Sequence, residues 1–229
     1  PKDDKRLKTE WVDIPSPNGN GKIRAYVVRP ANAAGPLPGI VVVHENRGLN
    51  PHIEDIARRL ALDNFLAVAP DALRPLGGYP ADGGEDKARE LFPKLDQAKT
   101  REDFIAATHY ARTRPDSSGK IGAVGFCYGG AMVNFLATRV PELLASVPFY
   151  GGAPPLEDVK NIKAAMLIHH GGNDRRLVEG WPAYETALKA AGVRYGGYVY
   201  PNAEHGFNND TTPRYAAAAA KLAWGRTIA

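Results

Sequence analysis

The residue most able to do covalent chemistry is the only cysteine of the chain, Cys127, which lies in Gly125-Phe126-Cys127-Tyr128-Gly129-Gly130. An apolar, strand-like run (121–124) precedes this hexapeptide, and a helix-like run (131–137) follows it. A strand that turns sharply into a helix through small residues around a nucleophile is a nucleophile elbow. Glycine is needed there because the turn is strained and side chains on either side would collide with their neighbours. The hexapeptide therefore predicts an exposed, reactive thiol.

A carboxylate and a histidine follow the cysteine in the chain, each directly after a predicted strand. Asp174 ends Gly171-Gly172-Asn173-Asp174, and His205 lies just beyond the last strand-like run. The order nucleophile, acid, histidine is that of α/β-hydrolase triads. The histidine would move the thiol proton, and the carboxylate would fix the imidazole tautomer and stabilise its charge. Glu179 and Asp158 compete as the acid, but only Asp174 follows a strand at once.

A tetrahedral oxyanion needs preorganised hydrogen-bond donors. We expect these to be the backbone N–H groups of Tyr128, at the start of the helix after the cysteine, and Asn46, in an earlier loop. His44-Glu45 resembles the beginning of a zinc-protease helix, but the residue four positions after His44 is Gly48 rather than a second histidine. Neither a metal ion nor an organic cofactor is therefore expected.

The remaining polar residues near predicted strands have simpler interpretations. His52 and His109 lie on predicted helices, where we expect them at the surface. His169 and His170 end a predicted strand, which favours a role in packing or in supporting the site. Asp71 also follows a strand, but it precedes the cysteine and is therefore out of triad order, so we interpret it as a loop or capping residue.

The pattern of apolar residues predicts an α/β fold. Two alternating segments, 7–14 and 22–28, indicate an N-terminal antiparallel hairpin. Continuous apolar runs then predict buried strands at 40–43, 65–68, 121–124, 145–149, 164–168 and 198–200. Segments with helical periodicity lie between these strands, and they include predicted helices at 182–191 and 213–224. The segment 72–99 is rich in Gly, Pro and charged residues and is interpreted as a lid. The fold class is that of an α/β-hydrolase: a mostly parallel central sheet with helices on both faces, whose ligands bind at the carboxyl ends of the strands.

Composition narrows the classes of function further. The 229 residues suit a single domain over 1–229, and the net charge of +4 is spread without a basic block, which argues against nucleic acid or a membrane surface as a partner. We expect a small-molecule substrate and a monomer or weak homodimer. The compartment stays open: cytoplasmic, or periplasmic if an export signal preceded Pro1.

Taken together, these motifs resemble the dienelactone hydrolase family, an α/β-hydrolase branch with a cysteine nucleophile. The resemblance covers nearly the whole chain and is most specific at 44–50, 68–71, 125–130, 150–151, 171–174 and 205–207. It implies the triad Cys127, Asp174 and His205, as the residues had already indicated. It further implies that Glu45 receives the thiol proton when a substrate displaces its carboxylate, so that the thiol stays protonated until then.

The resemblance also implies how a substrate would be recognised. The family holds the lactone's carboxylate with two arginines: Arg74 matches the first, whereas Asn209 stands at the position of the second. Tyr150 matches a tyrosine that lines the family's pocket. Three other arginines could complete the anion site: Arg47, Arg175 and Arg176.

The sequence thus predicts a hydrolase that cleaves a small lactone or carboxylic ester through an acyl-cysteine intermediate. Within enzymes, the alternatives are a thioesterase or a promiscuous phosphoester hydrolase. Outside enzymes, the alternative is a redox-sensing protein in which Cys127 is a regulatory thiol, although a sensor has no need of an acid-oriented histidine.

Overall fold

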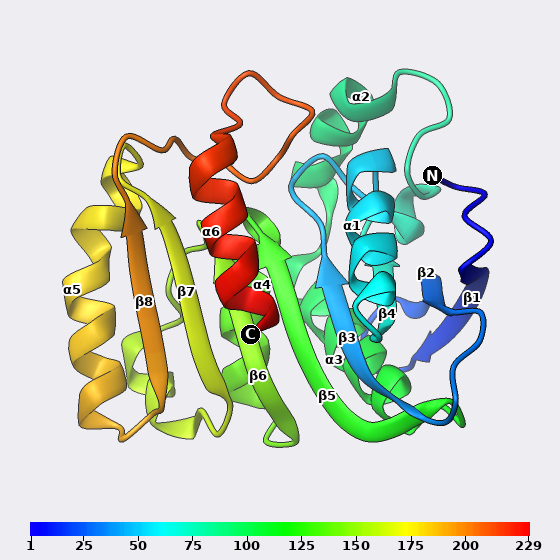
Figure 1. The fold of residues 1–229 in the computed structure, drawn as a ribbon, viewed down its shortest axis with the longest axis horizontal. Helices are drawn as coiled ribbons and strands as arrows, with labels where there is room; N and C mark the ends of the chain where they lie inside the picture. The colour runs from blue at the N-terminus through cyan, green and yellow to red at the C-terminus, as the bar shows by residue number, and fades with distance from the viewer. The chain divides into compact units, whose positions relative to one another are not determined.

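Strands and helices alternate along the chain in the order typical of α/β proteins (Figure 1). The structure is a computed structural model that describes residues 1–229. Its chain divides into two units, Pro1–Gly122 and Ala123–Ala229. Each unit contains strands that pair with one another and helices that cover them, which confirms the predicted α/β class.

The strands of the first unit begin with the predicted hairpin. β1 (Leu7–Ser16) and β2 (Gly21–Pro30) are antiparallel. β2 also pairs antiparallel with β4 (Leu66–Asp71), and β4 pairs parallel with β3 (Leu37–Val43), so the order is β1-β2-β4-β3. All six residues of β4 are buried, as expected for a strand covered on both faces.

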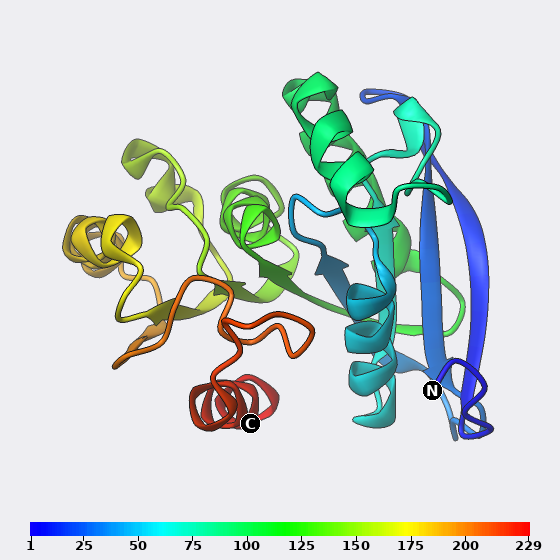
Figure 2. The same cartoon turned by 90° about the horizontal axis from the view of Figure 1, so that it is seen from above.

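Helices cover both faces of the strands in the first unit. α1 (Pro51–Leu62) and α3 (Gln97–Thr113) lie on opposite sides (Figures 1 and 2). Both begin at a side chain that accepts a backbone N–H bond, Asn50 for α1 and Asp96 for α3. The segment interpreted as a lid contains two short 3-10 turns and α2 (Gly84–Leu91), and its role as a lid stays a prediction.

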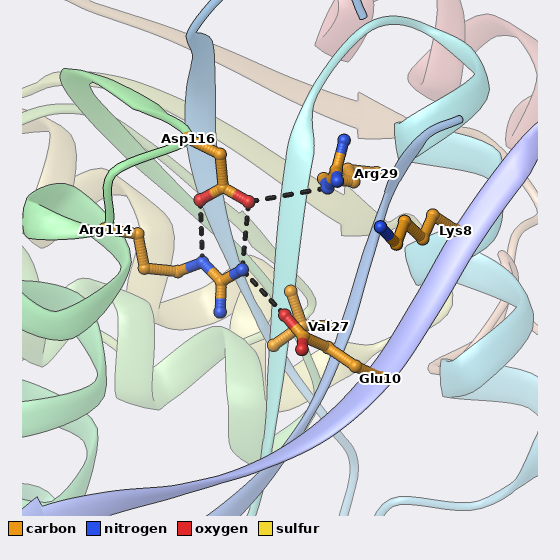
Figure 3. Close-up of a pocket in the computed structure, with 6 residues that line it drawn as sticks. All are labelled: Lys8, Glu10, Val27, Arg29, Arg114 and Asp116. Carbon is orange, nitrogen blue, oxygen red and sulfur yellow. Dashed lines mark hydrogen bonds and ion pairs between the residues drawn. The ribbon is translucent and has the colours of Figure 1, made fainter. Parts of the chain in front are cut away.

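A small charged cavity in the first unit has a volume of about 100 Å³ (Figure 3). The ion pairs that line it link the edge hairpin β1–β2 to the segment after α3. Arg114 lies just after α3 and donates to both carboxylate oxygens of Asp116, at 2.8 and 2.9 Å, and to Glu10 of β1 at 2.7 Å. Arg29 of β2 approaches Asp116 at 3.5 Å. The charges of this cavity therefore mainly satisfy one another and have a structural role.

The second unit begins with the last residues of β5 (Ser117–Phe126), which crosses the division between the units. β6 (Leu143–Phe149), β7 (Ala165–Gly171) and β8 (Tyr195–Tyr200) follow as parallel neighbours, in the order β5-β6-β7-β8. Because these strands run in the same direction, their carboxyl ends meet at one edge, where the loops carrying Cys127, Asp174 and His205 begin.

Helices again cover both faces of the second unit. α4 (Tyr128–Arg139) and α5 (Arg175–Ala190) lie on one side of β6–β8, and α6 (Ala217–Ile228) lies on the other (Figures 1 and 2). Buried His169 of β7 fastens α6, because its Nε2 lies 3.0 Å from the hydroxyl of Thr227. This contact fits the role in packing that the sequence favoured for His169. None of the helices is both long enough and apolar enough to cross a membrane.

The starts of two helices differ from the prediction. α5 begins at Arg175, seven residues before the predicted start, and holds Pro182 in its interior. An interior proline removes one N–H donor and crowds the carbonyl four residues earlier, which is why sequence patterns favour it in the first turn, but α5 continues through it. α6 begins at Ala217 rather than at 213.

Candidate active site

Cys127 lies at the turn between β5 and α4, as the hexapeptide predicts. Its backbone has φ 59° and ψ −115°, a region that residues with a side chain rarely adopt. A Cβ added at Gly125 would collide with the backbone of Gly129, and one added at Gly130 would lie 2.5 Å from the carbonyl oxygen of Phe149. The glycines therefore allow α4 to start against the strands, and the turn leaves the thiol partly exposed.

The thiol, an imidazole and a carboxylate form one continuous array. Nε2 of His205 lies 3.1 Å from Sγ of Cys127, and Nδ1 of the same ring lies 2.5 Å from Oδ2 of Asp174. The carboxylate accepts a hydrogen bond from the N–H of Nδ1, so this tautomer places the lone pair of Nε2 toward the thiol. The three residues that the sequence singled out are thus brought together, with the connectivity of a nucleophile, a base and an orienting acid.

Close backbone contacts bring the acid and the histidine to this position. A Cβ at Gly171 would lie 2.5 Å from the carbonyl oxygen of Ala203, so only glycine lets the two loops approach. The backbone N–H of Asn173 donates to that same oxygen at 2.9 Å, and its side chain donates to Glu204 at 2.7 Å. The loops after β7 and β8 are therefore fastened to each other on either side of the Asp174–His205 bond.

An aromatic side chain supports the imidazole. The ring of Tyr150 lies 5.1 Å from the ring of His205 and 5.4 Å from that of Phe207. Tyr150 is only 1 % exposed, has φ 38°, and donates its N–H to the carbonyl of His169 at 2.7 Å. It thus forms a fixed wall beside the base, and its place in a substrate pocket stays a prediction.

Exposure differs along the array. The side chain of Asp174 is 11 % exposed and that of His205 is 30 % exposed. The acid is therefore shielded, whereas the base can be reached by water or a substrate. Tyr128 is the first residue of α4, and backbone N–H groups at the start of a helix favour a nearby anion.

Three other predicted site residues lie in the first unit: Glu45 and Asn46 after β3, and Arg74 after β4. Glu45 is 3 % exposed, and its carbonyl oxygen accepts a 2.7 Å hydrogen bond from Nδ1 of His44. Nε2 of His44 accepts the backbone N–H of Ala72 at 3.1 Å. This bond requires a neutral ring, and burial lowers the pKa of His44 accordingly. His44 therefore fixes the loop that carries Glu45 and Asn46, whose relation to the thiol stays a prediction.

Asp71 is the loop-capping residue that the sequence indicated. Its carboxylate accepts the backbone N–H of Leu73 at 3.0 Å and that of Tyr79 at 2.8 Å. Between them lies Arg74, partly exposed, in a 3-10 turn. The role of Arg74 in binding an anion stays a prediction.

The remaining anion-binding candidates differ in how far they are engaged. Arg47 donates to Glu85 at 3.0 Å, and Arg175 donates to Glu179 at 2.7 Å. Asn209 is 1 % exposed, and its side-chain oxygen accepts both the backbone N–H and the hydroxyl of Thr211. Arg176 is exposed, and no hydrogen bond or ion pair engages its guanidinium.

Sequence reasoning misjudged one histidine and missed part of the second unit. His52 is on α1 as predicted but is buried, 5 % exposed, whereas His109 is exposed.

A cavity of about 180 Å³ borders α5, and its lining includes His170, Arg176, Gly180, Trp181 and Tyr184. The i, i+4 spacing of 176, 180 and 184 could have indicated a common helix face, but the helix was predicted to begin only at Pro182. No group of three or more His, Cys, Asp or Glu side chains is arranged to hold a metal ion.

Comparison with known proteins gives one consistent family. A sequence model described as "Dienelactone hydrolase family" matches residues 23–229. An Escherichia coli K12 protein named "Putative carboxymethylenebutenolidase" is 32% identical, covering 98% of this chain and 87% of that protein.

Two solved structures agree. One, titled "Putative Dienelactone Hydrolase", comes from Klebsiella pneumoniae and is 29% identical, with a TM-score of 0.79 over 96% of this chain and 97% of the other. Another, a dienelactone hydrolase-like promiscuous phosphotriesterase from metagenomic libraries, is 27% identical, with a TM-score of 0.81 over 97% and 96%. The predicted α/β-hydrolase fold is confirmed, and the chain belongs to the dienelactone hydrolase family of ester-hydrolysing enzymes.

Proposed function

We propose that this enzyme uses Cys127 as a nucleophile and cleaves a small lactone or carboxylic ester through an acyl-cysteine intermediate. The observation that carries the proposal is the array in which Nε2 of His205 lies 3.1 Å from Sγ and Nδ1 lies 2.5 Å from Asp174. A thiol reacts as its thiolate, so a base within hydrogen-bond reach is what the chemistry requires.

In the first half-reaction, Nε2 of His205 accepts the thiol proton as Sγ attacks the carbonyl carbon of the ester. The imidazolium that forms is stabilised by the carboxylate of Asp174. Negative charge develops on the carbonyl oxygen, and the backbone N–H of Tyr128 is the proposed donor to it, because it begins α4. The second donor that the sequence predicts is the backbone N–H of Asn46.

The tetrahedral intermediate then breaks the bond to the leaving oxygen, which takes the proton from His205. A thioester on Cys127 remains. In the second half-reaction, His205 accepts a proton from water, the resulting hydroxide attacks the thioester, and the thiolate leaves and is protonated again. Over both halves, one ester and one water give one acid and one alcohol, and for a lactone both groups stay in one product.

The family resemblance adds a means of keeping the thiol unreactive at rest. In this variant of the first step, which the resemblance implies, Glu45 takes the thiol proton in place of His205 once a substrate displaces its carboxylate, and the thiolate then pairs with His205. Its support within the structure is burial: the side chain is 3 % exposed, in a loop that His44 fixes at both ring nitrogens.

A phosphotriester is the second candidate substrate. It is favoured by the solved relative described as a promiscuous phosphotriesterase, which is 27% identical to this chain. Sγ would attack phosphorus in place of carbon and displace an alkoxide or phenoxide, with the proton again delivered by His205.

Transient kinetics with 4-nitrophenyl acetate test the proposal. We expect a burst of about one nitrophenolate per enzyme, followed by a slower steady rate. Cys127→Ala should lose both phases, and His205→Ala should slow the burst by about 10³-fold. Circular dichroism of each variant controls for folding. Full activity in Cys127→Ala would remove the thiol from the reaction, and reversible oxidation of Cys127 without any acylation would favour the redox-sensing alternative.

A further inference from the structure

A second feature beside the triad has no role in the steps above: the cavity along α5. It holds about 180 Å³ and is lined by Trp181, Tyr184, Leu177 and the residues that follow Tyr150, with His170 and Arg176 as its basic groups. Cavities of about 150 Å³ with apolar walls are large enough for a benzene ring. The volume therefore suits one six-membered ring with a small substituent.

Hydrogen bonds and ring contacts hold the side chains that line this cavity in place. The hydroxyl of Tyr184 donates to the side-chain oxygen of Asn134 at 2.6 Å, and the amide of Asn134 donates to the carbonyl of Gly152 at 3.0 Å. Trp181 packs edge-on against both Tyr184, at 5.8 Å between ring centroids, and His170, at 6.0 Å. Fixed aromatic edges of this kind favour a flat ligand, since little entropy is lost when they bind it.

His170 contributes a neutral ring to the lining of the cavity. The side chain is 3 % exposed, and its Nδ1 makes no hydrogen bond. Burial is the main cause that lowers the pKa of His170 to about 4, so the ring is neutral near pH 7. Because Nδ1 itself has almost no accessible surface, His170 presents its neutral ring, rather than this atom, to the cavity.

Arg176 contributes a positive charge that nothing in the chain neutralises. Its neighbour Arg175 bonds Glu179 at 2.7 Å, whereas the guanidinium of Arg176 is exposed and unengaged. The cavity of the first unit offers a contrast, because its arginines face the carboxylates of Glu10 and Asp116 (Figure 3). With His170 neutral, the cavity along α5 carries a net positive charge and is suited to an anion.

The cavity adjoins the catalytic array. The charges of Asp174 and His205 both act on His170. Arg176 lies two residues after Asp174, in the first turn of α5. The cavity wall at residues 151–153 directly follows Tyr150, whose ring packs 5.1 Å from that of His205. The cavity is thus bordered by residues that neighbour the acid and the base of the array in sequence or through their charges.

We propose that this cavity is a substrate subsite that takes a planar aromatic ring carrying a carboxylate. The ring lies beside Trp181 and Tyr184, and the carboxylate pairs with Arg176. The proposal rests on the proposed function in one respect: the molecule bound in the subsite is part of an ester substrate. The enzyme would then favour esters that carry an aryl carboxylate in the acyl group or in the leaving group.

Binding of benzoate to the Cys127→Ala variant, measured by calorimetry, tests the subsite without any catalysis. We expect saturable binding that Arg176→Gln weakens tenfold or more, because a charge-assisted pair is lost. Arg175→Gln is the matched control: it removes the same charge one residue away, outside the cavity, and should change the affinity less than twofold. Equal effects of the two substitutions, or no benzoate binding, would overturn the proposal.

A second pair of variants tests whether the ring enters the cavity. A Cβ at Gly180 or at Gly225 would meet no atom within 4 Å, and both positions are helical, so leucine should be tolerated at each. Only Gly180 borders the cavity. Gly180→Leu should abolish benzoate binding and Gly225→Leu should leave it intact; binding that survives Gly180→Leu contradicts the proposed location.

Turnover separates the subsite from the proposed mechanism. In the enzyme with Cys127 intact, 4-carboxyphenyl acetate should have a higher kcat/KM than phenyl acetate, and Arg176→Gln should reduce that ratio tenfold or more. If benzoate binds as predicted but Cys127 is never acylated, the mechanism fails and the binding site stands. If Cys127 is acylated but benzoate ignores Arg176, the subsite fails and the mechanism stands.

Discussion

The contact between Asp174 and His205 permits a quantitative prediction. When His205 accepts the thiol proton, its ring becomes positive next to the carboxylate, with 2.5 Å between Nδ1 and Oδ2. Two unit charges about 4 Å apart attract by about 4 kcal/mol at an effective dielectric of about 20. His205 is 30 % exposed, so water screens part of this, and about 3 kcal/mol is a reasonable expectation. Asp174→Asn should therefore slow acylation by about 10²-fold.

The substitution should affect the reaction far more than the fold. Asp174 precedes α5, but its side chain caps none of the helix N–H groups, so Asn should cost little stability there. The assay is the burst rate with 4-nitrophenyl acetate by stopped flow, alongside the urea midpoint of each protein. Glu179→Gln is the matched control, because it neutralises an exposed carboxylate nearby that pairs with Arg175.

The orienting role of Asp174 would be refuted by a burst rate within threefold of the unchanged enzyme. It would also be refuted if Glu179→Gln slowed the burst as much as Asp174→Asn does, since the loss of any nearby negative charge would then explain the slower burst. A loss of rate that follows a loss of folded protein would show only that the residue is structural.

Three further predictions concern the elbow, the resting thiol and stability. Gly125→Ala should cost about 2–3 kcal/mol in urea unfolding, because its Cβ meets backbone that must shift; a loss below about 0.5 kcal/mol would contradict the elbow packing. Glu45→Gln should raise the rate of Cys127 alkylation by iodoacetamide without substrate, since a nearby carboxylate disfavours the thiolate, and an unchanged rate would argue against the proposed role of Glu45. Burial lowers the pKa of His169 to about 3 and that of His170 to about 4, from 6.5. The unfolded chain thus binds more protons below pH 6.5, so stability is full above that pH and should fall by up to about 2 kcal/mol per histidine at pH 5. Equal urea unfolding free energies at pH 7.5 and pH 5 would contradict this.

The parts of the fold that sequence predicted well are those that local chemistry determines. The hairpin β1–β2 follows from alternation and a turn-rich link, and its register pairs Ile14 with Ile23. The elbow at Cys127 follows from the glycines around it, and it has the strained φ that the pattern requires. The order of Asp174 and His205 after their strands sufficed to identify the pair that the structure joins.

The parts that sequence missed depend on contacts between distant segments. His52 was predicted at the surface because helical periodicity alone does not show which polar residue faces the strands; it is buried. The early start of α5 was hidden by Pro182, a residue that sequence rules place at helix beginnings. The cavity beside α5 was missed for the same reason, since it needs the helix face from Arg176 to Tyr184 and the loop after β6 together.

The most direct test of the central proposal is to identify the atom that carries the acyl group. The enzyme is mixed with 4-nitrophenyl acetate, quenched in acid within the burst, digested and analysed by mass spectrometry. We predict an added acetyl group on the peptide that contains Cys127, removable by hydroxylamine at neutral pH as a thioester. An acetyl group on a serine, a lysine or His205, or rapid ester cleavage with Cys127 unmodified at every time point, would contradict the acyl-cysteine mechanism.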